Sequence, residues 1–295
     1  MSEKTAIQWT DHTFNIAWGC TKVSAGCTNC YADRDATRYG FDIWGPKTDR
    51  RTFGDKHWGE PLKWDRTAAN EKRRHRVFCS SMCDVFEDHP TIDAEREKLW
   101  PLIRATPWLD WQILTKRVER MAELAPQVPL PNVWVGASAE DQETFDERMP
   151  RLSRVPGLVS FLSLEPLLGP IDLCFNIYDA GQRPDWVIVG GESGPGARPC
   201  DVAWIRSILK QCREAGVACF VKQIGARPHA DIDEMDRWPF TSRAMFENRL
   251  TGDDYEDLRL RDRKGGDTAE WPEDLRVREF PPSPERASAD GGEAT

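Results

Sequence analysis

Three cysteines within eleven residues constrain this chain more than any other feature. Cys20, Cys27 and Cys30 follow the spacing C-x6-C-x2-C. Thiolates are the ligands that soft metal ions and iron–sulfur clusters take, and Gly19 and Gly26 allow the backbone to curl so that three sulfurs can converge. Because a structural zinc ion takes four protein ligands, three cysteines favour a [4Fe–4S] cluster with one open iron.

Other interpretations of these cysteines remain open. A C-x2-C pair can be a redox dithiol, and cysteine is also a common small core residue. Three clustered cysteines among glycines and polar neighbours fit core packing poorly. A zinc ion or a closed cluster would need a fourth ligand, which a distant Cys or His12 could supply.

The rest of the chain alternates apolar strand patterns with helical patterns. Such alternation predicts a parallel sheet covered by helices. About seven strands favour a partial or complete (β/α) barrel over the runner-up, a doubly wound sheet. We expect strands within 14–19, 76–82, 111–115, 133–137, 158–163, 185–190 and 218–222, and helices at 66–76, 91–105, 117–125, 142–155 and from the N-cap Asp201 to Gly216.

The domain organisation follows from where this alternation stops. Residues 1–225 are predicted to form one barrel-like domain with an insertion at about 33–75. Residues 226–280 are rich in charged residues and predict an acidic appendage on the barrel. Residues 281–295 consist largely of Pro, Ser, Ala, Gly and acids and predict a disordered tail.

Composition narrows the class of protein. A formal net charge of −9 argues against broad non-specific nucleic-acid binding but leaves room for a local basic groove. Nine cysteines without a secretory signal indicate a reducing cytoplasm. No run is long and apolar enough to span a bilayer, so we expect no membrane partner. The thirteen tryptophans are expected to be core residues first.

Every predicted strand ends in polar residues, and in parallel α/β folds chemistry gathers at that edge. Lys116, Glu165 and Lys222 are the candidate catalytic side chains. Gly190, Gly191 and Glu192, with Ser138, are candidates for binding a cofactor, because paired glycines admit a ligand close to the backbone. A tight turn with a capping Glu192 and exposed strand-end cations are the plainer alternatives. Further strand-end residues are Met82, Cys83, Asp84, Thr115, Arg117, Glu140, Ser193, Gly194 and Gln223.

The chain resembles a phage- and bacterium-encoded three-cysteine-motif family of unknown function that is named after phage gene products. The resemblance covers the chain up to about Pro281. It rests on the stretches 18–32 (WGCTKVSAGCTNCYA), 110–117 (DWQILTKR), 164–170 (LEPLLGP), 185–194 (DWVIVGGESG), 220–225 (FVKQIG) and 270–278 (EWPEDLRVR).

This family is similar, distantly, to radical S-adenosylmethionine (SAM) enzymes, whose three cysteines follow the first strand of a partial (β/α) barrel. The C-x2-C half of their usual C-x3-C-x2-C spacing is present, and the first gap is three residues longer. The resemblance implies a [4Fe–4S] cluster held by Cys20, Cys27 and Cys30, SAM as a second cofactor and an external electron donor. It also implies a separately encoded partner protein and a nucleic-acid base or nucleotide as substrate. The alternative is a zinc or closed-cluster module that processes nucleic acid without SAM.

Overall fold

Seven parallel strands form the centre of this protein. In the computed structural model, which describes residues 5–126, 130–231, 238, 255–258 and 260–282, they pair in the order β1-β2-β3-β4-β5-β6-β8. All six pairings are parallel. The strands are β1 His12–Phe14, β2 His75–Cys79, β3 Leu109–Thr115, β4 Val133–Ser138, β5 Val159–Leu164, β6 Trp186–Gly190 and β8 Ala218–Gln223.

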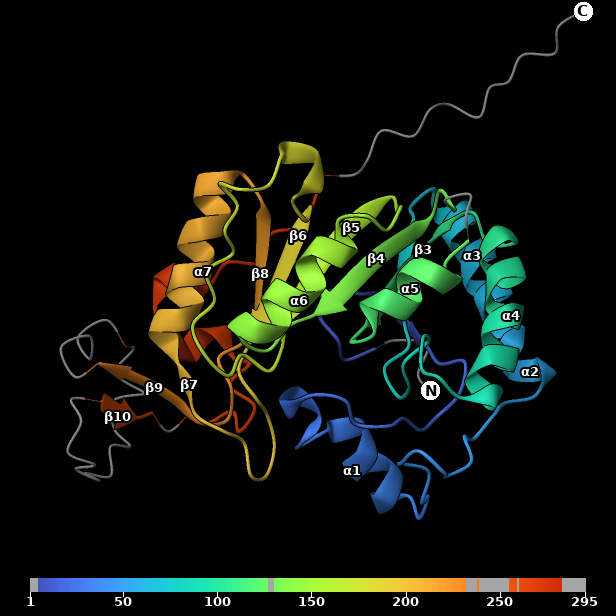
Figure 1. The fold of residues 1–295 in the computed structure, drawn as a ribbon, viewed down its shortest axis with the longest axis horizontal. Coiled ribbons are helices and arrows are strands. Elements are labelled where there is room, and N and C mark those ends of the chain that lie inside the picture. Colours follow the sequence, from blue (N-terminus) through green and yellow to red (C-terminus); the bar gives the residue numbers. More distant parts are fainter. Residues whose placement is uncertain (1–4, 127–129, 232–237, 239–254, 259, 283–295) are drawn as a thin grey trace, which may run out of the picture.

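Helices connect these strands and cover the convex face of the curled sheet (Figure 1). The connecting helices from residue 60 onward bury apolar residues against that face, whereas Ala32 and Ala36 of the first helix belong to a separate cluster with Ile43 and Met82. The predicted half-barrel is therefore confirmed. The helices are α1 Tyr31–Arg38, α2 Asp55–Trp58, α3 Glu60–Glu71, α4 Pro90–Arg104, α5 Val118–Leu124, α6 Gln142–Leu152 and α7 Val202–Ala215.

The largest differences from the expected boundaries are at the first strand and at the helix expected at 66–76. The first strand ends at Phe14, because Asn15 and Ile16 leave the sheet: the Asn15 side-chain oxygen accepts from the Met82 backbone N–H, and the Ile16 N–H donates to the Ser80 hydroxyl. The helix expected at 66–76 runs from Glu60 to Glu71, with Pro61 in its first turn and with Lys72 as its C-cap, whose φ of 51° is left-handed. The range expected as an insertion, 33–75, thus contains α2 and α3.

The concave face of the sheet carries an aromatic cluster that fills the base of the half-barrel. Trp186 lies at its centre, with ring centroids of Trp9, Trp134 and Phe220 each 6.1 Å away. Phe78 and Phe161 complete the cluster. We call these six residues the aromatic plug. The expectation that tryptophan serves mainly as core holds for Trp9, Trp134 and Trp186, which are all buried.

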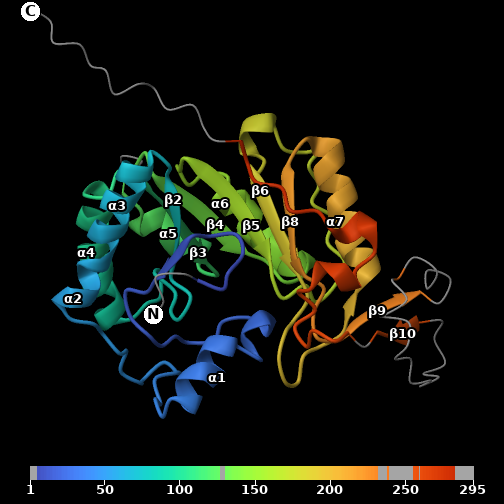
Figure 2. The same ribbon diagram turned by 180° about the vertical axis from the view of Figure 1, so that it is seen from behind.

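The C-terminal segment closes the free edge of the sheet beside β8. The backbone at 277–279 pairs antiparallel with β8, through bonds such as Val221 N–H to the Val277 carbonyl at 2.9 Å. The Phe280 ring then packs at a tilt against Trp186, with 5.4 Å between the ring centroids, and the guanidinium carbon of Arg76 lies 4.2 Å from the Phe280 ring centroid. Figure 2 shows the sheet and this C-terminal segment from the opposite side to Figure 1.

The structure also contains a small second sheet, in which β9 Pro228–Asp231 and β10 Tyr255–Asp257 come from the expected appendage and β7 Cys200–Asp201 comes from the range expected as the barrel domain. The tail at 283–295 lies outside the described residues. None of the described helices is both long and apolar enough to cross a lipid bilayer.

Candidate functional site

The concave face changes character along each strand, from aromatic at the base to polar at the carboxyl end. Side chains two positions apart share a face of a strand. On β5 the inward residues run from Phe161 to Ser163 and continue to Glu165, and on β8 Phe220 is followed by Lys222. The same spacing places Ser138 and Gly190 inward on β4 and β6. Four of the predicted site residues thus lie on the concave face at the carboxyl ends of the strands, a region that we call the mouth: Ser138, Glu165, Gly190 and Lys222.

The most direct contact at the mouth is an ion pair. Lys222 Nζ lies 2.7 Å from Glu165 Oε2, and their side chains are 31% and 12% exposed. The Ser163 hydroxyl donates to the other Glu165 oxygen at 3.4 Å. A Cβ added to Gly190 would lie 3.0 Å from the Gln223 carbonyl oxygen and 3.3 Å from the same carboxylate, so glycine leaves room for both neighbours. This pair joins the ends of two strands that are not adjacent in the sheet.

The cysteine loop, residues 19–31, lies against the mouth together with α1, below the carboxyl ends of the strands in Figure 1. Each of its three sulfurs lies beside a polar group. Arg117 donates to Cys20 Sγ at 3.7 Å, and Ser24 Oγ lies 3.8 Å from Cys27 Sγ. Cys30 is the N-cap of α1, where the backbone N–H groups of Asp33 and Ala32 lower the pKa of its thiol against the larger effect of burial, which raises it.

Burial keeps two of these thiols protonated in the absence of a metal. Desolvation, followed by the charge of Asp84, raises the pKa of Cys20 to about 12, although Arg117 opposes the shift. Burial likewise raises the pKa of Cys30. Because a metal ligand must be a thiolate, the positive charge of a metal or cluster is needed to hold these sulfurs deprotonated.

The chemistry of this donor set fits an iron–sulfur cluster or another soft metal, since all three cysteines are free, half-buried thiols on one loop. Among the described residues, no group of three or more His, Cys, Asp or Glu side chains is arranged to hold a metal ion. That finding concerns a single ion, whereas a [4Fe–4S] cluster takes each cysteine sulfur on a different iron. The assignment of Cys20, Cys27 and Cys30 as ligands stays a prediction.

Buried charges hold the loop in place, and the first group lies beside Cys20. Arg117 pairs with Asp84 at 2.9 Å and donates to the Thr21 carbonyl oxygen at 2.8 Å. Asp84 also accepts from the Thr115 hydroxyl at 2.7 Å. The end of β3 and the loop after β2 are thereby tied to the start of the cysteine loop.

A second buried pair supports this group. Arg50 binds Glu87 through two hydrogen bonds of 2.9 Å, and both side chains are at most 2% exposed. The same guanidinium donates to the Thr21 hydroxyl at 3.1 Å. Arg117 lies 3.8 Å from Glu87, so the two pairs form one buried network of two cations and two carboxylates.

Glu140, after β4, holds the middle of the loop. Its side chain is fully buried and accepts from Ser24 Oγ at 3.0 Å, from Lys116 Nζ, and from Arg148 at 3.1 Å. Although burial alone raises it, Lys116 and Arg148 hold the pKa of Glu140 below its ordinary value. A Cβ on Gly26 would come within 2.6 Å of this carboxylate, so only glycine permits the close approach. In this structure Lys116 supports the loop, and its predicted catalytic role is untested.

Glu192, after β6, holds the end of the loop through Arg198 and Asn29. Arg198 donates to both of its carboxylate oxygens, at 2.9 and 2.6 Å, and Asn29 donates at 2.9 Å. Arg198 also donates to the Ala25 carbonyl oxygen. These donors outweigh the opposing effect of burial and lower the pKa of Glu192. A Cβ on Gly191 would lie 2.6 Å from the Ile224 carbonyl oxygen, so this glycine admits neighbouring backbone.

Sequence reasoning missed the partners that lie outside strand ends. Arg50, Ser24, Asn29 and Arg198 sit in polar loops without periodicity, where nothing marks one polar residue above its neighbours. The one available signal was proximity to the cysteines, which Ser24 and Asn29 share.

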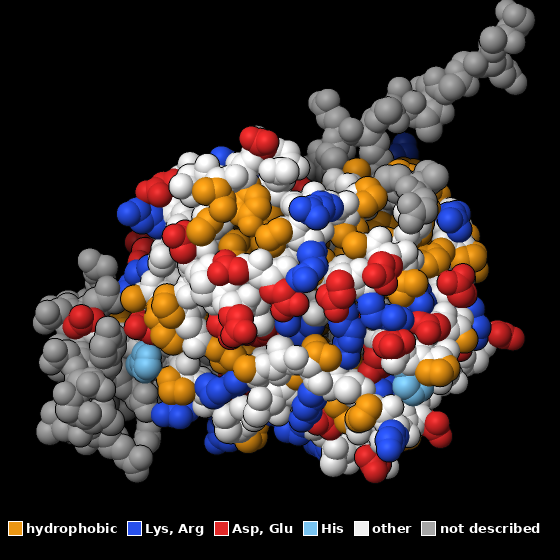
Figure 3. Space-filling view, in the orientation of Figure 1, with side chains coloured by type: hydrophobic (Ala, Val, Ile, Leu, Met, Phe, Trp, Pro, Cys, Tyr) orange, Lys and Arg blue, Asp and Glu red, His pale blue; other side chains and the backbone are white. Residues whose placement is uncertain are grey.

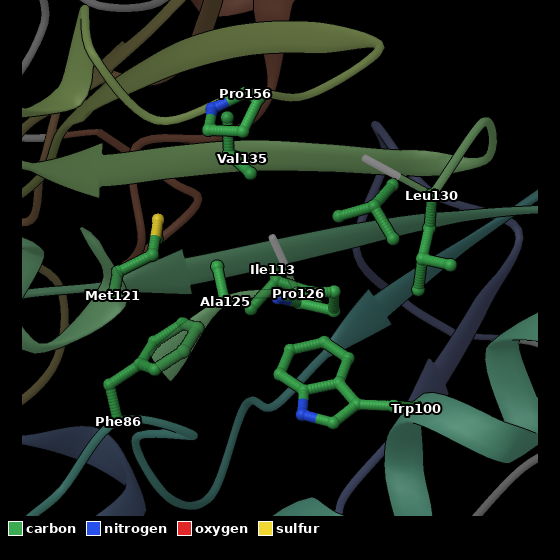
Figure 4. Close-up of a pocket in the computed structure, with 10 residues that line it drawn as sticks. Phe86, Trp100, Ile113, Met121, Ala125, Pro126, Leu130, Val135 and Pro156 are labelled. Atoms are coloured by element: carbon green, nitrogen blue, oxygen red, sulfur yellow. The ribbon is translucent and has the colours of Figure 1, made fainter. Parts of the chain in front are cut away.

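A mixed-charge surface and an apolar cavity lie elsewhere in the molecule. Lys and Arg side chains gather in the lower half of Figure 3, interleaved with acidic ones, so the positive charge there is local within an acidic chain. An apolar cavity lies between the sheet and its helices, lined by Trp100, Ile113, Met121 and Val135 among others (Figure 4). Because Ile113 and Val135 belong to the helix-covered core, this cavity is separate from the mouth.

Comparison with known families identifies one family that matches most of the chain. Residues 4–262 match a family described as a protein of unknown function (DUF5131). No curated protein matches the chain.

Among solved structures, one of spore photoproduct lyase complexed with dinucleoside spore photoproduct is 13% identical, with a TM-score of 0.40 over 83% of this chain and 67% of the other. A mutant of that enzyme with bound AdoMet and the dinucleoside is 13% identical, with a TM-score of 0.43 over 86% and 69%. Because both TM-scores are below 0.5, we draw no conclusion from this similarity. The half-barrel is established by the strand pairing of this chain.

Proposed function

We propose, for a chain that belongs to the family of proteins of unknown function DUF5131, that it is a radical-SAM-like iron–sulfur enzyme. In this proposal Cys20, Cys27 and Cys30 hold a [4Fe–4S] cluster, and SAM binds to its open iron. The cluster and SAM together would supply a one-electron cleavage of the sulfonium to methionine and a 5′-deoxyadenosyl radical. The protein contributes binding, orientation and exclusion of water.

One observation carries the proposal: a loop with three free cysteines lies between the first strand and α1, against the mouth of a parallel half-barrel, and side chains from other strand ends hold it there. A loop that only packed in the core would not need buried charges to fix it beside polar strand ends. The donor set also suits a soft metal centre with an open position.

We assign roles to the other predicted site residues from their positions and contacts. Glu165 and Lys222 face the mouth as a partly exposed pair, so they are the groups available to bind or exchange a proton with a substrate. Ser138 and Gly190 lie on the same inner face and could line the cofactor pocket. Glu192 would act through Asn29 and Arg198, since its oxygens already accept from both.

The proposed partners are an external low-potential electron donor and a separately encoded partner protein, both on the basis of the family resemblance. A nucleic-acid base or nucleotide is the first substrate class to test on the same basis. The cytoplasm suits these assignments because it keeps exposed thiols reduced.

The test is anaerobic purification with iron, sulfide and zinc analysis. We expect about four irons and four sulfides per chain, as a cysteine-held [4Fe–4S] cluster implies. Replacement of Cys20, Cys27 or Cys30 by Ala should abolish the cluster. Cys212→Ala is the matched control, because Cys212 is fully buried between α7 and the sheet, and it should keep the iron.

Reduced protein mixed with SAM should then yield 5′-deoxyadenosine and methionine. Stoichiometric zinc without acid-labile sulfide would establish the alternative, a zinc module. A full cluster that binds no SAM would establish an iron–sulfur module without SAM chemistry.

A further inference from the structure

Arg117 is the one charged side chain among the described residues that a hydrogen bond joins to a cysteine sulfur of the loop. Its Nη1 lies 3.7 Å from Cys20 Sγ, within the range of an N–H···S hydrogen bond. The Arg117 side chain is 9% exposed, so solvent screens its charge little. The same side chain is fixed by Asp84, at 2.9 Å, and by the Thr21 carbonyl oxygen, at 2.8 Å.

The other two sulfurs have weaker neighbours. Cys27 faces the neutral hydroxyl of Ser24, and Cys30 lies at the N-terminus of α1 beside backbone N–H groups. Hydrogen bonds from a charged donor are roughly twice as strong as neutral ones. Cys20 is thus electrostatically distinct from the other two proposed ligands.

We propose that Arg117 is a positioning residue that raises the reduction potential of the cluster through its hydrogen bond to the Cys20 sulfur. This inference rests on the proposed function. Reduction adds one electron and makes the cluster more negative, and a cationic N–H donor at a ligand sulfur stabilises the more negative state. The electron comes from the external donor, and Arg117 itself is neither oxidised nor reduced.

The charges of the buried network determine in which direction each substitution should shift the reduction potential. Arg117→Gln removes a positive charge and leaves Asp84 and Glu87 beside the cluster, which opposes reduction. Asp84→Asn removes a negative charge while Arg117 stays, which favours reduction. Arg117→Lys keeps the charge but lacks the planar fork that reaches Asp84, Thr21 and Cys20 together.

The experiment is an anaerobic spectroelectrochemical titration of the reconstituted full chain with viologen mediators, followed by EPR of the reduced cluster. We expect Arg117→Gln to shift the reduction equilibrium about tenfold toward the oxidised state, which corresponds to about 59 mV for one electron. Arg117→Lys should shift it less in the same direction, and Asp84→Asn in the opposite direction. Arg120→Gln is the matched control, because Arg120 lies on α5 and pairs with Asp88 and Asp93, and should leave the potential unchanged.

The outcomes separate the two proposals. If the wild-type chain assembles no cluster, the proposed function fails and this inference fails with it. If the wild type assembles a cluster and Arg117→Lys, Arg117→Gln and Asp84→Asn all keep the potential of Arg120→Gln, the inference alone is overturned. Should Arg117→Gln fail to fold, opposite shifts in Arg117→Lys and Asp84→Asn still support it, and their absence overturns it.

Discussion

The two ends of the half-barrel are stabilised by opposite means. At the base, the aromatic plug fills the interior with Trp and Phe rings that pack edge to face around Trp186. At the mouth, buried and half-buried ion pairs fix the cysteine loop. Apolar packing is non-directional and contributes most of the sheet's stability. Charged hydrogen bonds instead fix the geometry of the groups they join, at a high cost in desolvation.

This difference indicates that the base mainly stabilises the fold, whereas the charged residues at the mouth mainly fix the cysteine loop. Replacing residues of the plug should lower the free energy of unfolding without altering the loop in the molecules that remain folded. Replacing charged residues that hold the loop should alter the loop first. The following predictions test that division, from the largest expected effect to the smallest.

Trp186→Ala should cost about 3–5 kcal/mol of unfolding free energy, because it leaves a large cavity in a tightly packed core. Trp186 is fully buried. Urea unfolding followed by circular dichroism measures the loss, and the folded fraction at low urea should still bind iron at the wild-type ratio. A loss below about 1 kcal/mol, on the scale of a surface substitution, would show that the plug is not the main core of the base.

Glu192→Ala should cost less, about 1–2 kcal/mol, as expected for the loss of charged hydrogen bonds to one carboxylate. Its main effect should be local, since Asn29 and Arg198 lose their common acceptor. Hydrogen–deuterium exchange of peptides covering residues 19–31 should rise while exchange in β3 and β4 stays unchanged. Equal acceleration in all of these peptides would contradict the division between base and mouth.

Gln112→Met should raise the unfolding free energy by about 1 kcal/mol. Gln112 is fully buried on the concave side of β3, and neither amide atom has a hydrogen-bond partner among the described residues. Removing an unsatisfied buried polar group while keeping its volume is favourable. Thermal unfolding compared with Leu114→Met, the next inward position on the same strand, provides the control. A destabilised Gln112→Met protein would mean that the amide has a partner, such as a buried water.

The pH dependence of the loop should follow Glu140. Because Lys116 and Arg148 hold the pKa of Glu140 below its ordinary value of 4.5, its contribution is complete above pH 4.5 and is lost as the pH falls through the lower, folded-state pKa. Exchange of the 19–31 peptides in the metal-free protein, corrected for the intrinsic rate, should therefore rise at acid pH. In Glu140→Gln the exchange should already be raised at neutral pH and change less on acidification.

The sequence predicts the sheet well because buried parallel strands are short apolar runs, and each helix pattern between them follows the period of 3.6. It misplaces the first strand because Asn15-Ile-Ala-Trp18 is as apolar as a strand, and only the long-range bonds of Asn15 and Ile16 to residues 80–82 show otherwise.

The candidate site can be predicted from the sequence only in part. The rule that polar residues gather at strand ends identifies Arg117, Glu140 and Glu192, since topology alone brings those ends together. It does not distinguish residues that face the mouth, such as Lys222, from residues that hold the loop, such as Lys116. That distinction depends on which side chain finds a buried counter-ion, and here the counter-ions come from segments far away in sequence.

The pairing of residues 277–279 with β8 has a practical consequence for handling the protein. The chain leaves this edge strand toward Pro282 at the base, on the side away from α1 and the cysteine loop (Figure 1). A linker attached after Pro282 therefore anchors the molecule by its base. An electrode or resin coupled there leaves the mouth open to solution, so reductants and small molecules could be exchanged over the immobilised protein.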